Sequence, residues 1–285
     1  MKGLIQDLAS FPALVWKMFR YPGGVTPRKL PYGPDPAQYF LDFAPAPEKD
    51  RGLVVVYLHG GGWDKGSPAF FTFIGQRLAQ EGYRCVMPGY RLVPKFRFPA
   101  QLEDVTAGTK AALRHLEKQG VDTARTVVVG SSAGGQLGAL LCYTGELAGR
   151  FVGFAGLGGP YRFDLDPPLS LNVLGTRLLD GGDPVTAQPG LLLDRQSPKT
   201  PMLLIHGLED GVVGFPCGMD FYRRALSLNI PATLYLPETG KDSHSDYVVG
   251  CFLEKRETCG TLNALLTWLE GLAERGPEPF VPETV

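Results

Sequence analysis

One serine in a glycine-rich motif has the surroundings expected of a nucleophile. Ser132 is the central residue of GSSAG over 130–134, a GxSxG pattern. The residue types around it predict a strand over Thr126–Val129 and a helix over Ala133–Tyr143. A tight turn between strand and helix would project the serine hydroxyl above a sheet, and small flanking residues would let the two elements approach closely. We therefore predict that Ser132 is the nucleophile, with Ser131 as the competing candidate.

A second glycine cluster could stabilise the negative charge that a nucleophilic attack creates. HGGGW over 59–63 follows an apolar run over 53–58, which predicts a strand buried on both faces. Glycines leave backbone N–H groups unshielded, so two of them could converge with the N–H of Ala133 on an oxyanion. A flexible turn or a phosphate-binding loop is the alternative, although neither a GxGxxG nor a Walker pattern is present. Trp63 beside this loop is expected to contact the substrate.

A serine hydroxyl needs a base to take its proton, and the sequence has four histidines. His59 is expected to brace the glycine loop, and His206 to hold the turn after a strand. His115 lies within a predicted helix, on what we expect to be a solvated face. His244 remains, in a polar loop after the last predicted strand. The chain order serine, acid, histidine would place the base there.

The acid that orients the histidine should follow a strand between Ser132 and His244. HGLED over 206–210 meets this condition, and Asp210 lies further past the strand end, where the loop can bend its carboxylate toward the base. Such a carboxylate would hold the imidazole tautomer and stabilise the imidazolium. The alternatives are Glu209, Asp242 and Asp246.

The elements that must position these residues alternate along the chain. Strands are predicted at 39–43, 53–58, 84–87, 126–129, 151–157, 202–205 and 232–236. Helices are predicted at 70–80, 101–118, 133–143, 215–228 and 247–272. This alternation indicates a mostly parallel sheet with helices on both faces, in one domain over 1–285.

Two segments lie outside this alternation. Residues 1–20 predict an amphipathic helix bent at Pro12, which we expect to pack on its own domain; a lid or a membrane-surface helix is the alternative. Residues 21–36 are rich in Pro and Gly and predict an extended linking segment. The long irregular segment over 158–200 lies between two core strands, and we expect it to form a small cap over the site.

Composition excludes several classes of partner. The chain has 28 basic and 29 acidic residues, a net charge of −1, so we expect no nucleic-acid partner. Its five cysteines are scattered and show no metal-binding spacing, which indicates reduced thiols, no metal or other cofactor, and a cytoplasmic location. We expect no membrane-spanning helix and no secretory signal.

Together the motifs resemble the hormone-sensitive-lipase-like branch of α/β-hydrolases, and related carboxylesterases and feruloyl-esterase-like proteins. The matching text is HGGGW from 59, YRLVPKFRFPAQLEDV from 90, GSSAGG from 130, SPKTPMLLIHGLED from 197 and the loop around His244. The resemblance implies the α/β-hydrolase fold, with a mostly parallel sheet of the eight-stranded type and a small cap. It implies a catalytic triad of Ser132, Asp210 and His244. It implies an oxyanion hole of Gly61, Gly62 and Ala133, and structural roles for Tyr90, Arg91 and Asp104.

The function expected from these residues is hydrolysis of carboxylic esters through an acyl-enzyme. A small cap and Trp63 favour short acyl chains or compact aromatic groups on a small-molecule ester. An amide hydrolase of the formamidase kind would use the same residues and is the alternative. A non-catalytic binding protein on this fold, such as the gibberellin receptor, lacks a working triad histidine, and His244 argues against that reading.

Overall fold

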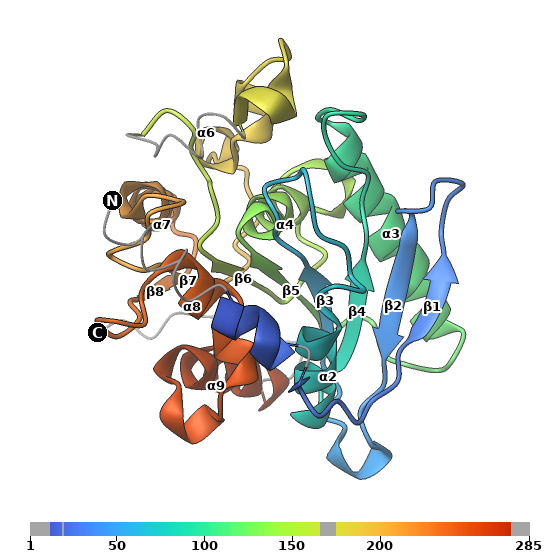
Figure 1. Ribbon diagram of the computed structural model, residues 1–285. Helices are drawn as coiled ribbons and strands as arrows, with labels where there is room; N and C mark the ends of the chain where they lie inside the picture. The colour runs from blue at the N-terminus through green and yellow to red at the C-terminus, as the bar shows by residue number, and fades with distance from the viewer. Residues whose placement is uncertain (1–11, 19, 166–174, 275–285) are drawn as a thin grey trace.

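A mixed sheet of eight strands forms the centre of the protein. The computed structural model describes residues 12–18, 20–165 and 175–274 (Figure 1). The strand order is β1-β2-β4-β3-β5-β6-β7-β8. Strand β2 pairs antiparallel with both β1 and β4, and every pairing from β4 through β3 to β8 is parallel. The strands are β1 (Arg28–Pro31), β2 (Tyr39–Phe43), β3 (Val54–Leu58), β4 (Arg84–Pro88), β5 (Thr126–Ser131), β6 (Gly153–Leu157), β7 (Met202–Ile205) and β8 (Ala232–Tyr235). This confirms the predicted fold class.

The central strands are buried on both faces, as their apolar runs predict. In β3, Val54 and Val56 belong to the hydrophobic core on one face of the sheet, whereas Val55 and Tyr57 belong to the core on the other. Successive side chains of a strand point to opposite faces, so a strand that is covered on both sides needs an unbroken apolar run. The sheet therefore separates two cores.

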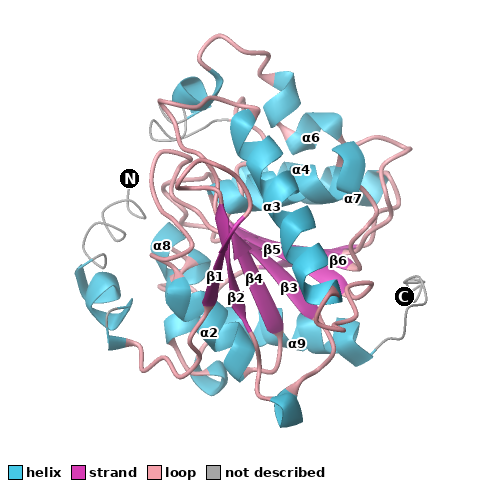
Figure 2. Cartoon of the chain, turned by 90° about the vertical axis from the view of Figure 1, so that its right-hand side faces the viewer, coloured by secondary structure: helices cyan, strands magenta, loops and turns pink. Residues whose placement is uncertain are grey.

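Helices cover both faces of the sheet (Figure 2). The core on one face takes residues from α3, α4 and α7, and the core on the other from α2, α8 and α9. The α-helices are α2 (Thr72–Gln80), α3 (Ala100–Glu117), α4 (Ala133–Tyr143), α6 (Pro189–Leu192), α7 (Phe215–Ser227), α8 (His244–Val248) and α9 (Gly260–Glu274). Short 3-10 turns are η1 (Pro47–Lys49), η2 (Gly145–Leu147), η3 (Val185–Ala187), η4 (Gly250–Leu253) and η5 (Arg256–Thr258).

The prediction of one closing helix over 247–272 is wrong. The chain there is divided into α8, η4, η5 and α9, with extended backbone at Glu254 and Cys259. Arg77 of α2 explains part of this path, because its guanidinium donates hydrogen bonds to the carbonyls of Phe252, at 3.1 Å, and Glu254, at 2.5 Å. A partner from a distant element thus satisfies carbonyls that a continuous helix would have used itself.

The linking segment over 21–36 also contains a strand that the sequence did not indicate. Among the described strands, β1 pairs with β2 alone, at the edge of the sheet. It is largely exposed and therefore carries no apolar run. Edge strands with polar residues and proline avoid pairing with other chains, but this composition also hides them from pattern-based prediction.

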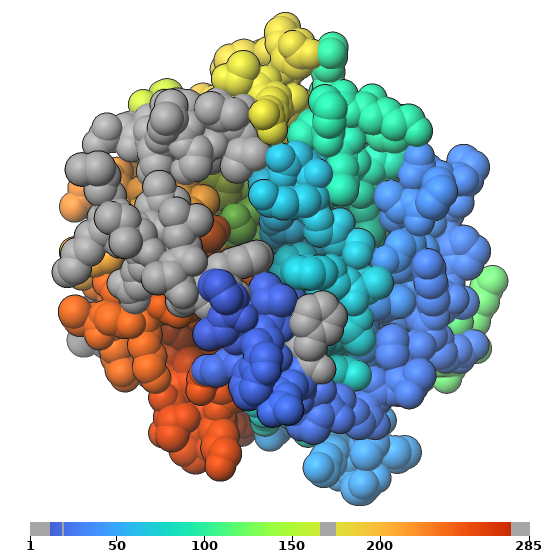
Figure 3. Space-filling model, viewed as in Figure 1, coloured from blue at the N-terminus to red at the C-terminus, as the bar shows by residue number. Residues whose placement is uncertain are grey.

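The described part of the N-terminal segment is helical over residues 12–18 and packs on the domain itself. Lys17 forms an ion pair with Glu254 at 2.6 Å, and Figure 3 shows this helix in blue against the orange chain beyond β8. The predicted residues before it, and the bend at Pro12, fall at or outside the limit of the described residues. No helix in the described ranges is long and apolar enough to cross a membrane.

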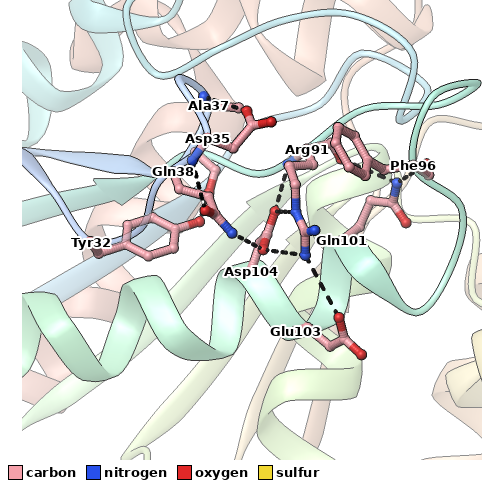
Figure 4. Close-up of polar contacts among 10 residues, drawn as sticks. Tyr32, Asp35, Ala37, Gln38, Arg91, Phe96, Gln101, Glu103 and Asp104 are labelled. Carbon is pink, nitrogen blue, oxygen red and sulfur yellow. Dashed lines mark hydrogen bonds and ion pairs between the residues drawn. The ribbon is translucent and has the colours of Figure 1, made fainter.

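A partly buried ion pair fixes the chain between β4 and α3 (Figure 4). The guanidinium of Arg91 donates two hydrogen bonds to the carboxylate of Asp104, at 2.7 and 2.9 Å, and Gln38 donates a third at 2.7 Å. The hydroxyl of Tyr90 donates to the carbonyl of His59 at 2.9 Å. Arg91 and Asp104 therefore hold the segment after β4, and Tyr90 ties it to the glycine loop, as the resemblance implied.

Candidate active site

Ser132 occupies the turn between β5 and α4 with a strained backbone. Its φ of 53° and ψ of −121° are unusual for a residue with a side chain. A Cβ added at Gly130 would lie 2.2 Å from the carbonyl oxygen of Gly134, and one added at Gly134 would lie 2.0 Å from that of Leu58. The glycines of the motif are thus required by backbone packing, and they hold the serine in this conformation.

Gly134→Ala is expected to destabilise the protein by about 3 kcal/mol or more, because the new methyl group would overlap backbone atoms of β3. Chemical denaturation would measure the loss. Gly271→Ala in α9 is the matched control, since a Cβ there meets nothing within 4 Å. This control should gain about 0.5–1 kcal/mol from helix propensity. Equal stability of the Gly134 variant and the wild type would contradict the packing argument.

The structure brings the three predicted triad residues together. His244 Nδ1 lies 2.7 Å from Asp210 Oδ2, and His244 Nε2 lies 2.9 Å from Ser132 Oγ. Asp210 follows β7, and His244 is the first residue of α8. This is the chain of contacts that a serine nucleophile, a base and an orienting acid require.

The other acids considered for the orienting position have different surroundings. Glu209 is exposed. Asp242 accepts a hydrogen bond from the N–H of Gly240 at 3.0 Å, and Asp246 accepts one from the Ser243 hydroxyl at 2.6 Å.

The Asp210 carboxylate is buried and surrounded by donors. Its Oδ1 accepts hydrogen bonds from the N–H groups of Val212 and Val213, both at 2.8 Å. Its Oδ2 accepts from His244 and, in a short contact, from the Tyr247 hydroxyl. Burial alone would raise the pKa of Asp210, but the adjacent His244 and the further donors hold this pKa below its usual range. The carboxylate therefore stays ionised.

The remaining histidines have structural surroundings. His206 Nε2 bonds the carbonyl of Val213 at 2.8 Å, and His59 Nδ1 bonds that of Gly60 at 2.8 Å, as expected for residues that hold turns. The solvated position expected for His115 is wrong. Its side chain is only 20% exposed, and its Nε2 lies 3.6 Å from Asp42 on β2.

Burial of His59 predicts a pH-dependent loss of stability. Burial lowers the pKa of His59 from 6.5 to about 4, so only the unfolded chain takes up this proton between those values. The free energy of unfolding should therefore fall between pH 7 and pH 4.5, and His59 should contribute about 2–3 kcal/mol of the fall. Urea titrations of the wild type and His59→Phe at both pH values would measure the contribution of His59 to the fall in the free energy of unfolding. Equal falls in the two proteins would contradict it.

The glycine loop lies against the nucleophile. A Cβ added at Gly60 would lie 3.1 Å from Ser132 Cβ, and Gly61 and Gly62 have φ values of 119° and 60°. Among the described residues, none accepts a hydrogen bond from the N–H of Gly61 or Gly62. Ala133 begins α4, so its N–H precedes the hydrogen bonds of the helix. Ala133 directly follows Ser132, and Gly61 and Gly62 continue the loop whose Gly60 lies against it.

Trp63, which is predicted to contact the substrate, is buried in the structure. Its ring is only 1% exposed, and its Nε1–H donates to Gln136 Oε1 at 3.1 Å. Gln136 in turn donates to the carbonyl of Ala187 at 2.7 Å. The burial argues against direct contact between the indole and a substrate. Trp63 and Gln136 instead connect the glycine loop, α4 and the segment over 158–200.

Ser131, the competing nucleophile, is fully buried beneath the turn. Its hydroxyl accepts a hydrogen bond from Tyr57 at 2.8 Å and donates one to the carbonyl of Val248 at 2.9 Å. These contacts link β3, β5 and α8, so Ser131 has a structural role here. Sequence reasoning did not identify Tyr57, Gln136 or Tyr247, because isolated polar residues in apolar or loop segments carry no signal of their partners.

No group of three or more His, Cys, Asp or Glu side chains in the described ranges could hold a metal ion. All five cysteines are buried as free thiols.

Comparison with known proteins agrees with this architecture. A family model described as alpha/beta hydrolase fold matches residues 55–150, which include the glycine loop and Ser132. The chain is therefore similar to this family over residues 55–150 and has its fold. Esterase B from Lactobacillus Rhamnosis superposes with a TM-score of 0.74 at 21% identity, covering 96% of each chain. An esterase from Thermogutta terrifontis gives a TM-score of 0.71 at 22% identity, covering 88% of this chain and 93% of that one.

Curated relatives of this chain are longer than the regions they share with it. Esterase LipC from Mycobacterium tuberculosis is 30% identical over 244 residues, 75% of this chain and 59% of the relative. Arylacetamide deacetylase from Oryctolagus cuniculus is 46% identical over 94 residues, 31% of this chain and 23% of the relative. The chain therefore spans less than two thirds of these relatives. The matches confirm the resemblance to the hormone-sensitive-lipase-like and carboxylesterase branch.

Proposed function

We propose that this protein hydrolyses carboxylic esters of small molecules through an acyl-enzyme on Ser132. The observation that carries the proposal is the continuous contact from Asp210 to His244 and from His244 to Ser132, at 2.7 and 2.9 Å. A neutral imidazole in this position can take the serine proton because the carboxylate fixes its other nitrogen as a donor. Matches to proteins named esterases support the same reaction class.

The proposed reaction has two halves. Ser132 Oγ attacks the ester carbonyl while His244 takes its proton, and the N–H groups of Gly61, Gly62 and Ala133 bind the oxygen that becomes negative. His244 then gives the proton to the departing alcohol, which leaves the acyl group on Ser132. Water then attacks this ester while His244 takes a proton from it. His244 returns this proton to Ser132 Oγ, so the carboxylic acid is released and the free serine is restored. No cofactor takes part.

For the substrate, we propose short acyl chains or compact aromatic groups. The described parts of the segment over 158–200 contain only short helical pieces, and we propose that it forms a small cap within a single catalytic domain. One relative is named ethyl acetate hydrolase, which supports a short acyl group. The buried ring of Trp63 would shape the wall from behind instead of contacting the ester.

A substrate panel with a covalent probe would test this function. A series of chromogenic esters from acetyl to decanoyl should give the highest kcat/KM at the short end. A fluorophosphonate should label Ser132, as mapped by mass spectrometry of the peptides. Labelling elsewhere, or no ester turnover, would overturn the proposal. Faster turnover of an N-formyl aromatic amine than of any ester would assign an amide hydrolase.

A further inference from the structure

A tyrosine hydroxyl shares the carboxylate oxygen that orients the base. Tyr247 Oη donates a short hydrogen bond to Asp210 Oδ2, the same atom that lies 2.7 Å from His244 Nδ1. The side chain of Tyr247 is 1% exposed. Burial, followed by the negative charge of Asp210, raises the pKa of the Tyr247 phenol well above its usual range. The hydroxyl therefore keeps its proton and acts as a donor.

Tyr247 and the base belong to the same short helix. His244 begins α8, Tyr247 lies three residues later, and Val248 ends the helix. The carbonyl of Val248 accepts a hydrogen bond from the Ser131 hydroxyl, next to the nucleophile. Consecutive residues of α8 thus anchor it to the acid and to the nucleophile turn. Any shift of α8 that moved His244 would break one of these two contacts.

We infer that Tyr247 is a positioning residue for the proposed hydrolysis, which sets the orientation and the proton affinity of the Asp210–His244 pair through its hydrogen bond to Asp210 Oδ2. The inference rests on the proposed function. Two consequences follow from the shared oxygen. The hydroxyl fixes the plane of the carboxylate toward His244. It also draws negative charge from Oδ2, which weakens the electrostatic stabilisation of a protonated imidazole by the carboxylate.

Two further titratable groups in the described part of the chain, His206 and Tyr161, lie close to Asp210, His244 and Tyr247. His206, at the end of β7, has its Nε2 3.8 Å from Asp210 Oδ2, and burial lowers its pKa, so it stays neutral in the working range. Tyr161, from the loop after β6, is buried beside Tyr247, and burial raises its pKa so that it also stays neutral. Tyr247 is therefore the group whose removal should change the pH response of the base.

Tyr247→Phe removes the hydroxyl and keeps the ring. We expect kcat to fall about tenfold with KM unchanged, because one charge-assisted hydrogen bond is lost away from the substrate. Without this donor the carboxylate holds the imidazolium more strongly. The acidic limb of the kcat/KM profile should therefore move to higher pH, by about half a unit to one unit. A ring-fluorinated tyrosine placed at 247 is a stronger donor and should move the limb to lower pH.

Tyr83→Phe is the matched control. Tyr83 is as deeply buried, and its hydroxyl has no hydrogen-bond partner among the described residues, so its removal should leave the pH profile and kcat unchanged. The inference is overturned if Tyr247→Phe and the fluorinated protein both keep the acidic limb of the wild type, even where Tyr247→Phe lowers the melting temperature. That result, with Ser132 still labelled by a fluorophosphonate, would leave the proposed function intact. Absence of that labelling would instead refute the proposed function.

Discussion

Ser132→Ala is expected to lower kcat/KM for a short-chain ester by a factor on the order of 10⁵ to 10⁶, because no other group can form the acyl-enzyme. The residual rate would come from the oxyanion donors and substrate binding alone. Loss of one hydroxyl at this strained turn removes no packing, so the melting temperature should stay within a few degrees. Steady-state kinetics at high enzyme concentration and thermal unfolding would measure both effects.

The neighbouring serine provides the matched control. Ser131→Ala leaves the Tyr57 hydroxyl and the Val248 carbonyl without their partner inside the core. The expected result is a stability loss of about 1–3 kcal/mol with a far smaller loss of activity than in Ser132→Ala. Ser132→Ala should therefore lose mainly activity, whereas Ser131→Ala should lose mainly stability. If Ser132→Ala kept the wild-type rate, or if Ser131→Ala lost as much activity, the assignment of the nucleophile would fail.

The parts of the fold that the sequence predicted best are those whose residues are buried on both sides. The observed bounds of β2, β7 and α4 agree with the predictions, because apolar runs of defined length ended by glycine, proline or polar residues admit few alternatives. The edge strand β1 was missed because exposure removes that pattern. The closing helix was predicted as continuous because the effect of Arg77 on its carbonyls depends on an element far away in sequence.

The site also contains residues that the sequence indicates and residues that only the folded chain shows. Ser132, Asp210 and His244 were predicted as the triad because each follows a predicted strand in the chain order that nucleophilic catalysis on this fold requires, and the structure brings their side chains into contact. Tyr247 and Gln136 act through contacts that only the folded chain creates, so residue type and spacing gave no indication of them. The burial of Trp63 could not be predicted from the sequence for a related reason. Its place beside the glycine loop suggested contact with a ligand, whereas packing turns the ring inward.

Asp210→Asn is expected to lower kcat/KM by about 10⁴-fold, through the tautomer of His244 and not through loss of charge alone. Both carboxylate oxygens face donors: two backbone N–H groups at Oδ1, and His244 with Tyr247 at Oδ2. An amide oxygen that keeps the backbone N–H groups places its NH₂ against His244 Nδ1. That nitrogen must then accept, and the imidazole proton moves to Nε2, which faces Ser132 and can no longer act as a base.

Nitrogen NMR of the labelled imidazole would detect this change of tautomer directly. Glu209→Gln is the control, because this neighbouring carboxylate is exposed and should be replaceable without effect. A rate for Asp210→Asn within about tenfold of the wild type would exclude Asp210 as the orienting acid. A large loss of rate with Nδ1 still protonated would keep Asp210 in the site but assign its effect to charge, since the base would then retain the correct tautomer for accepting the Ser132 proton.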